Sequence, residues 1–192
     1  MGGRILMGGF ENAYTTVLEE LKATFESINE SEIEELITII TNSDQVFFVG
    51  VGRVLLSLKS IAKRWSHLGI KCVVVGDITE PAIKKNDVLI VGSGSGESII
   101  PLEIAKKAKD LQAVVVHIGS NGESSISKLS DLFVRIPVQT KLYLDDEIPS
   151  SQPMTSLFEQ MLLLLGDVVG LMIIKEKSIN LDSLWEFHAN LE

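Results

Sequence analysis

The sequence predicts a three-layer α/β fold, a doubly wound sandwich around a five-stranded parallel sheet in flavodoxin-like order. Short apolar runs rich in Val and Ile alternate with stretches of helical periodicity, as in sheets covered on both faces. A length of 192 residues with 45% hydrophobic content also suits one core. Right-handed crossovers between parallel strands place helices on both faces of the sheet. We therefore expect residues 1–192 to form a single domain.

Two amphipathic helices are expected before the sheet. Apolar residues recur at three- and four-residue steps over 10–25, and a second such stretch covers 33–40. The glycine-rich residues 1–9 lack the cationic and apolar pattern of a signal segment, and we expect them to be flexible. By elimination, the protein is expected in the cytoplasm.

The elements of the sheet follow in regular order. The five expected strands are short and dense in Val and Ile, as buried parallel strands are. A long irregular connection over 137–152 is rich in acids, and loops of this length are commonly functional. Strands are expected at 46–49, 72–75, 88–91, 113–118 and 132–136, and helices at 54–68, 99–111 and 125–129.

A last helix is expected from Pro153 to about Lys175, with proline at its first position. Apolar side chains cover more than one face of it, so it must be buried nearly all round. Packing between subunits is the economical explanation, and a satisfied monomer core is the alternative. Its most apolar stretch, 161–174, is interrupted by two glycines and Asp167, so we expect it to be too short and too broken to span a bilayer. We expect a homo-oligomer, either a dimer or a tetramer, and no membrane partner.

Composition limits the possible partners. A net charge of -9 disfavours unspecific nucleic-acid binding, because phosphate backbones bind clustered Lys and Arg. Any anionic ligand must then be held by local donors. The single cysteine, Cys72, lies in an apolar run and indicates a buried strand residue in a reducing compartment, not a catalytic thiol.

A Gly/Ser loop with the sequence SGSGES follows the third expected strand and precedes a helix. Its glycines let successive backbone N–H groups turn toward one point, its hydroxyls surround that point, and the helix directs its positive dipole end there. This arrangement predicts a phosphate site, and the alternative is a polar turn whose serines cap the helix. No lysine follows the last glycine, so a small phosphorylated metabolite is favoured over a nucleotide with magnesium, and neither cofactor nor metal is expected. The expected phosphate ligands are Ser93, Gly94, Ser95, Gly96 and Ser98.

A second glycine turn, from Gly50 to Arg53, follows the first expected strand. The third glycine of a dinucleotide fingerprint would fall on Leu55, so NAD is disfavoured. In a doubly wound sheet both turns lie at the carboxyl edge where the strand order reverses. We expect Gly52 and Arg53 to meet the ligand there, with a surface guanidinium as the alternative for Arg53.

Glu159 is the candidate for a general base. It lies in the apolar last helix, with Leu162 and Leu163 one turn onward. Such neighbours would raise the pKa of its carboxyl toward the range useful for a base near neutral pH. The alternative is an exposed glutamate on a polar stripe.

Several motifs together carry a resemblance that covers almost the whole chain. The chain resembles the SIS (sugar isomerase) domain family of phosphosugar isomerases and phosphosugar-binding regulators, and within it the 6-phospho-3-hexuloisomerases of the ribulose monophosphate pathway. The specific parts are the segment 152–159, which begins Gln-Pro-Met, and the terminal HANLE at 188–192, whereas many SIS proteins share the Gly/Ser loop. The other motifs are GVGR at 50–53, HLG at 67–69 with Gly76, TEPAI at 79–83, and Thr140-Lys141.

The resemblance implies interconversion of 3-hexulose 6-phosphate and fructose 6-phosphate through a cis-enediolate. Glu159 would move the carbon-bound proton. His188 would exchange protons at the sugar oxygens or help to open a ring, reaching into the site of a neighbouring subunit, and its near-neutral pKa suits that task. Ser120, after the fourth strand, would add a hydroxyl to the phosphate site. The alternative for His188 is a frayed terminal residue.

One position departs from the pattern that the resemblance implies. Val54 stands where these isomerases usually have a serine that supplies a phosphate hydroxyl. This departure keeps two alternatives open, an isomerase of another sugar phosphate and a sensor that binds a phosphosugar without turnover. Among the other polar residues, His67 and His117 are expected in core or capping roles, Glu97 either at a helix start or on the ligand, and Thr140 and Lys141 in a lid.

Overall fold

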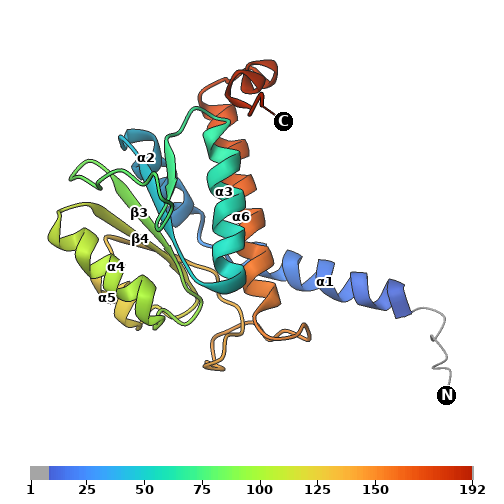
Figure 1. Ribbon diagram of the computed structural model, residues 1–192. Coiled ribbons are helices and arrows are strands. Elements are labelled where there is room, and N and C mark those ends of the chain that lie inside the picture. The colour runs from blue at the N-terminus through green and yellow to red at the C-terminus, as the bar shows by residue number, and fades with distance from the viewer. Residues whose placement is uncertain (1–8, 192) are drawn as a thin grey trace.

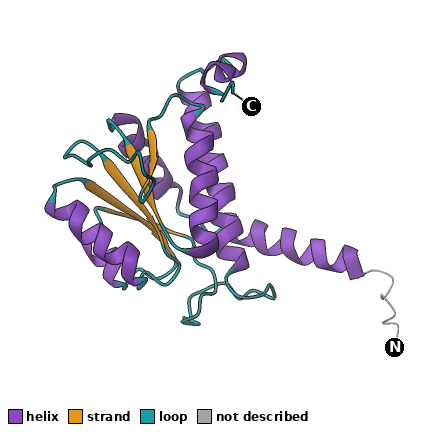
Figure 2. Cartoon of the chain, viewed as in Figure 1, coloured by secondary structure: helices purple, strands orange, loops and turns teal. Residues whose placement is uncertain are grey.

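The computed structural model describes residues 9–191 and contains the expected parallel sheet. Its five strands run in the order β2-β1-β3-β4-β5, and every pairing is parallel (Figure 2). The order reverses between β1 and β3, because β2 lies on one side of β1 and the later strands on the other. The strands are β1 (Val46–Val49), β2 (Cys72–Val74), β3 (Val88–Gly92), β4 (Val114–Gly119) and β5 (Leu132–Arg135).

Helices cover both faces of the sheet, which confirms the three-layer architecture (Figure 1). One layer holds α2, α3 and α6, and the other holds α4 and α5. The helices are α1 (Gly9–Phe25), α2 (Glu30–Asn42), α3 (Gly52–Ser66), α4 (Ile99–Asp110), α5 (Ser125–Leu129) and α6 (Ser156–Glu176), followed by the 3₁₀ helix η1 (Leu181–Phe187).

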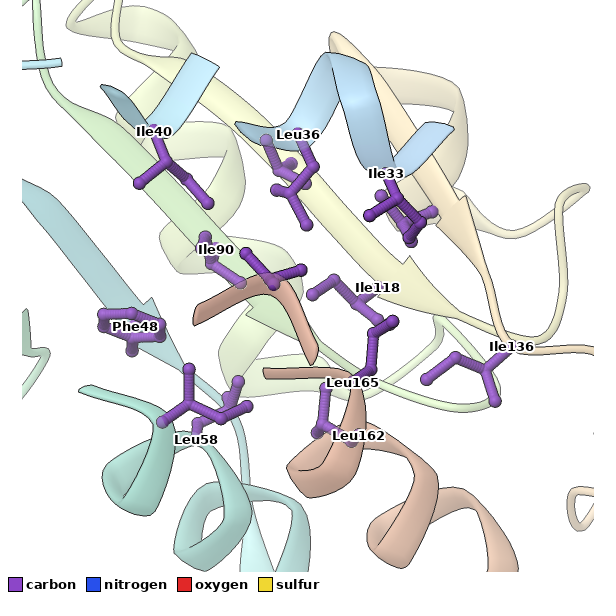
Figure 3. Packing of buried hydrophobic residues seen from close by; sticks show 14 of the residues in the cluster. Ile33, Leu36, Ile40, Phe48, Leu58, Ile90, Ile118, Ile136, Leu162 and Leu165 are labelled. Atoms are coloured by element: carbon purple, nitrogen blue, oxygen red, sulfur yellow. The ribbon is translucent and has the colours of Figure 1, made fainter. Parts of the chain in front are cut away.

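The larger core lies between the sheet and the layer of α2, α3 and α6. Figure 3 shows side chains from these helices and from β1, β3 and β4 converging there. A β-carbon on Gly166 of α6 would overlap the Ile61 side chain of α3, so the glycine permits the close approach of the two helices. Trp65 Nε1 also donates to the Gly166 carbonyl at 2.8 Å. The glycine that interrupts the apolar stretch therefore serves packing.

The start of α6 corrects the expected helix boundary. The helix begins at Ser156, not at Pro153, because Met154 between them has a left-handed backbone with φ of 57°. The Ser156 amide donates to the Pro153 carbonyl at 3.2 Å and closes a turn before the helix. Pro153 is therefore the first residue of this turn, and Thr155 is the N-cap residue of α6.

The surroundings of α6 correct two further expectations. By length and composition this 21-residue helix could cross a membrane, so the expectation that it is too short and too broken was wrong. Its position is that of a core helix, with 56% of its most apolar window buried inside the protein. It is also not buried nearly all round, because Asp167 and Leu171 are exposed. Residues 1–9 were expected to be flexible. Of these, the structure describes only Gly9, which is the first residue of α1.

Candidate active site

A cavity of about 240 Å³ opens at the carboxyl edge of the sheet, where the strand order reverses. It is lined by the turns after β1 and β3, by the long loop before α6, and by the start of α6. The two glycine turns therefore meet as expected. The lining residues are Val51, Gly52, Arg53, Val54, Gly92, Ser93, Gly94, Ser95, Ser98, Thr140, Lys141, Thr155, Phe158 and Glu159.

The Gly/Ser loop has a fixed internal geometry. Ser93 Oγ accepts from the Gly96 amide at 3.1 Å and lies 3.2 Å from Ser98 Oγ. Gly96 has a positive φ of 66°, and a β-carbon there would collide with the Ser124 side chain. Only glycine satisfies both conditions. Gly96 thus shapes the loop and is not among the residues that line the cavity.

The carbonyl groups of the loop are bound on the side of β4 and α5. Ser93 O lies 2.9 Å from His117 Nε2, and Gly94 O accepts from the Ser120 amide at 2.9 Å. Within residues 9–191 the amides of Gly94, Ser95 and Ser98 have no hydrogen-bond acceptor. Unpaired amides on a loop that leads into a helix are suited to an anion such as phosphate.

Ser98 decides between the two interpretations of the serines. It is the N-cap residue of α4, yet its side chain makes no capping hydrogen bond. Its hydroxyl lies beside that of Ser93 instead, and both residues line the cavity. The polar-turn alternative, in which these serines cap the helix, is therefore not the arrangement adopted. The hydroxyls and the positive end of the α4 dipole adjoin the same cavity.

Glu159 is buried, with 8% of its surface exposed, and is held from two sides. Thr155 Oγ1 donates to its Oε1 at 2.9 Å, and Arg53 Nε lies 2.9 Å from its Oε2. The Arg53 N–H does not align with Oε2 as a hydrogen bond, so this oxygen has a charged neighbour but no aligned donor. Arg53 Nη1 also donates to Ser156 Oγ at 3.3 Å. A carboxylate oxygen with spare acceptor capacity at a cavity wall is what a proton-abstracting base requires.

Four cavity residues were missed by sequence reasoning: Val51, Gly92, Thr155 and Phe158. Phe158 packs beneath Gly94, whose added β-carbon would lie 3.5 Å from the ring. Thr155 is four residues before Glu159, and this spacing places both on one helix face, so the signal was present in the sequence. The ion pair of Arg53 with Glu159 was not anticipated, because Arg53 was assigned to the ligand alone.

Comparisons with known proteins identify the family of this chain. A family model described as "SIS domain" matches residues 39–166. A Bacillus subtilis protein named 3-hexulose-6-phosphate isomerase is 39% identical over 92% of this chain and 95% of its own length. A Mycobacterium gastri protein of the same name is 33% identical, over 94% of this chain and 90% of its own.

The chain belongs to the SIS domain family.

A solved SIS-like structure supports the fold as well. From the crystal structure of a Methanococcus jannaschii protein, a molecular function of 3-hexulose-6-phosphate isomerase was inferred for that protein. It superposes with a TM-score of 0.81 at 29% identity and covers 94% of this chain and 99% of its own. The resemblance stated from the motifs is therefore confirmed at the level of the family and the fold.

Two residues that were expected in this site, Ser120 and His188, do not line the cavity. Ser120 is fully buried, and its hydroxyl donates to the Val138 carbonyl at 2.9 Å, so it holds the loop through its backbone amide and is not a direct ligand. His188 follows η1 at the end of α6 opposite to the cavity, where its ring stacks on His67 with centroids 5.2 Å apart (Figure 1). Within one chain, His188 and Glu159 are not brought together.

The other polar residues singled out in the sequence have definite roles. The Glu97 carboxylate accepts from the Ser125 amide at 2.8 Å, and the hydrogen bonds from Ser125 lower its pKa. It therefore caps α5. Thr140 donates from its amide and its hydroxyl to the buried Glu147 carboxylate, at 3.0 Å and 2.9 Å, and thereby places its neighbour Lys141 at the cavity. His67 is the C-cap residue of α3, as expected of a capping role.

Val54 lies at the cavity wall in the first turn of α3. Its Cγ1 is 2.9 Å from the position that a β-carbon on Gly92 would take. The valine therefore packs against the end of β3 and presents a methyl group where a hydroxyl would face a ligand. No group of three or more His, Cys, Asp or Glu side chains that could hold a metal occurs among residues 9–191.

Proposed function

We propose that this SIS-domain protein is a phosphosugar isomerase that interconverts 3-hexulose 6-phosphate and fructose 6-phosphate. The observation that carries the proposal is a buried carboxylate, Glu159, in one cavity with the unpaired amides of Gly94, Ser95 and Ser98. Such a site places an anion-binding loop and a base on the walls of one small cavity, so that one small phosphorylated molecule can reach both. The names of the B. subtilis and M. gastri relatives support the choice of substrate.

The phosphate binds to the unpaired amides and to the hydroxyls of Ser93, Ser95 and Ser98. The sugar chain then extends toward α6. Glu159 removes the proton from C2 of the 3-hexulose, the electron pair of that C–H bond forms the C2–C3 double bond, and the carbonyl oxygen at C3 becomes an oxyanion. Arg53, which adjoins Glu159, stabilises the negative charge of this cis-enediolate. The hydroxyl proton on O2 then moves to O3, which shifts the negative charge to O2. Return of the carbon-bound proton from Glu159 to C3 converts the C2–O⁻ group into the C2 ketone of fructose 6-phosphate.

A homo-oligomer, dimer or tetramer, completes the proposal. The helix α1 projects from the body of the molecule (Figure 1). Its residues Phe10 and Leu18 are 83% and 59% exposed. An exposed apolar stripe of this kind favours burial against a second copy. In the assembly, we assign His188 to the active site of a neighbouring subunit. There it exchanges protons at the sugar oxygens. A cytoplasmic role in the ribulose monophosphate pathway follows from the same substrate.

Val54 favours one alternative, the isomerisation of a different sugar phosphate. Loss of a hydroxyl that donates to a charged phosphate weakens binding by about 1.5–3 kcal/mol. A substrate with other contacts to the cavity could tolerate this loss better than fructose 6-phosphate. A phosphosugar sensor without turnover is the remaining alternative from another functional class.

Proton exchange separates these functions. The protein is incubated with fructose 6-phosphate in heavy water, and the sugar is followed by NMR. Deuterium entering at C3 is the expected result, because the enediolate spans C2 and C3. Entry at C1 instead would indicate an aldose–ketose isomerase. Binding without exchange would overturn the catalytic proposal and leave the sensor.

Glu159→Gln is the matched variant for this experiment. The amide keeps the size of the carboxylate and can still accept from Thr155, but it cannot take a proton. We expect exchange to fall by at least about 100-fold, the usual contribution of a general base, with binding of inorganic phosphate unchanged. Full exchange in this variant would remove Glu159 from the mechanism.

A further inference from the structure

His117 lies behind the Gly/Ser loop, on the side away from the cavity. It is a fully buried residue of β4, on the face that packs against α4 and α5. Its ring packs on Phe133 of β5, with centroids 5.1 Å apart. A β-carbon added to Gly96 would lie 3.0 Å from His117 Cε1, and one added to Gly119 would collide with Nε2. The imidazole is therefore fixed on every side.

The partners of the two ring nitrogens define its hydrogen bonding. Nε2 lies 2.9 Å from Ser93 O, and a carbonyl can only accept, so Nε2 carries the hydrogen. Burial lowers the pKa of His117 to about 4, so near neutral pH the ring is uncharged and Nδ1 is an acceptor. Ser127 Oγ of α5 lies 2.8 Å from Nδ1 and 3.1 Å from the Asn121 carbonyl, so with this tautomer its single hydrogen goes to Nδ1, the nearer acceptor. His117 thus links α5 to the Gly/Ser loop.

The Ser93 carbonyl has two neighbouring donors, His117 Nε2 at 2.9 Å and the Gly96 amide at 3.1 Å, and only the first comes from outside the loop. The direction of this carbonyl determines that of one cavity amide. The carbonyl of Ser93 and the N–H of Gly94 belong to one planar trans peptide and point in opposite directions. A donor that holds the carbonyl on the β4 side therefore turns the Gly94 N–H away from β4. Gly94 lines the cavity, and its amide has no acceptor within the described part of the chain.

We infer that His117 is a positioning residue for phosphate: its Nε2–H holds the Ser93 carbonyl and thereby aims the Gly94 amide at the phosphate of the substrate. This inference rests on the proposed function. The ring touches neither the cavity nor the sugar. Its effect is on the anion holder, which binds the phosphate equally in the ground state and in the transition state. Loss of the contact should therefore raise KM and leave kcat nearly unchanged.

Two amide side chains separate this role from a merely structural one. In His117→Gln the amide nitrogen reaches the place of Nε2 and can donate to Ser93 O. In His117→Asn the shorter amide reaches only the place of Nδ1, so it can bond Ser127 but not Ser93. Val115→Ala is the control for stability, because Val115 is fully buried on the same strand and face and pairs with Leu89, four residues before Ser93.

The measurements are KM and kcat for fructose 6-phosphate, the Kd of inorganic phosphate by NMR titration, and Tm. We expect His117→Asn to raise KM and Kd about tenfold, the effect of losing one hydrogen bond to a charged group, with kcat changed less than about threefold. His117→Gln should stay within about threefold of the wild type in all three constants. Val115→Ala should lower Tm and leave KM unchanged.

Three outcomes overturn the inference. Equal KM values for the Asn and Gln variants would show that the Ser93 contact has no part in binding. A rise in KM for Val115→Ala that follows its Tm would show a general loss of packing. If the wild type catalyses exchange but all variants bind phosphate equally well, the inference about His117 fails and the proposed function stands. A wild type that binds neither phosphate nor fructose 6-phosphate would overturn both the proposed function and the inference.

Discussion

Val54 is the residue on which the choice of substrate depends. It lines the cavity and packs against the end of β3, so its side chain is part of the wall that a phosphosugar meets. Val54→Ser replaces the two methyl groups by one hydroxyl at this wall. If the substrate is fructose 6-phosphate, the new donor should lower KM about tenfold, as expected of a hydrogen bond to a charged acceptor. Steady-state kinetics with fructose 6-phosphate measure this change.

Val54→Ala is the control for the serine variant, because it removes the methyl groups without adding a donor. The alanine variant should leave KM within about twofold of the wild type and lower stability by about 1 kcal/mol. If serine and alanine change KM alike, the hydroxyl does not meet the phosphate. The preference for another sugar phosphate would then be the better explanation of Val54.

The sequence predicted most of the loop residues that line the site, but it could not predict in which direction each side chain points. Ser93, Ser95 and Ser98 were found because a Gly/Ser loop between a strand and a helix permits few arrangements. Ser120 was assigned to the ligand because it follows a strand, but its hydroxyl turns to Val138, which is distant in the sequence and joins the site only in the fold. Such a partner leaves no local pattern.

Among the elements, α6 carries both the base and a close contact with α3 at Gly166. Gly166→Ala should destabilise the protein by about 1–3 kcal/mol, because its β-carbon overlaps Ile61 and forces α3 and α6 apart. The matched substitution is Gly170→Ala, one turn onward, where the nearest atoms lie 3.7–3.9 Å from the added carbon. This second alanine should stabilise by up to about 1 kcal/mol through helix propensity. Urea unfolding of both variants gives the comparison, and equal effects would contradict the packing argument.

Element boundaries show why the helix was predicted and its start was not. The periodic apolar side chains of α6 identify a helix, and Pro153 fits a first helical position. The left-handed backbone of Met154 delays the helix to Ser156, although methionine rarely takes that conformation. Nothing in the residue types predicts this, because the tertiary structure fixes the turn. The turn brings Thr155 to the carboxylate of Glu159.

For the whole molecule, the buried polar groups predict a loss of stability in acid. Burial lowers the pKa of His117 from 6.5 to about 4, although its bond to Ser93 and the charge of Glu97 oppose this. The unfolded chain therefore binds a proton that the folded chain does not between these values. The free energy of unfolding should fall by on the order of 3 kcal/mol as the pH drops from 6.5 to 4, while this contribution is complete above pH 6.5.

The carboxylates act in the same direction at lower pH. Hydrogen bonds from Ser151, Ser150 and Gln152 lower the pKa of Glu20 in spite of its burial, so its contribution is lost as the pH falls below about 4.5. His117→Gln removes only the histidine part. Its stability should decline less than that of the wild type between pH 6.5 and 4.5, as measured by urea unfolding at several pH values. Parallel curves for the two proteins would contradict the assignment to His117.

At the same scale, the separation of Glu159 and His188 predicts a site shared between subunits. The two residues lie near opposite ends of α6, which rises about 25 Å between Glu159 and its last residue. If the histidine acts in the site of a neighbour, Glu159→Gln and His188→Ala are each inactive alone but complement each other when mixed. In a dimer with two symmetric sites, the mixed species has one intact site, so unfolding and refolding a 1:1 mixture should restore about a quarter of the wild-type activity. No recovery in a mixture that forms hybrid oligomers would show that His188 does not act in the site of a neighbour. Activity of His188→Ala alone would place this residue outside the reaction.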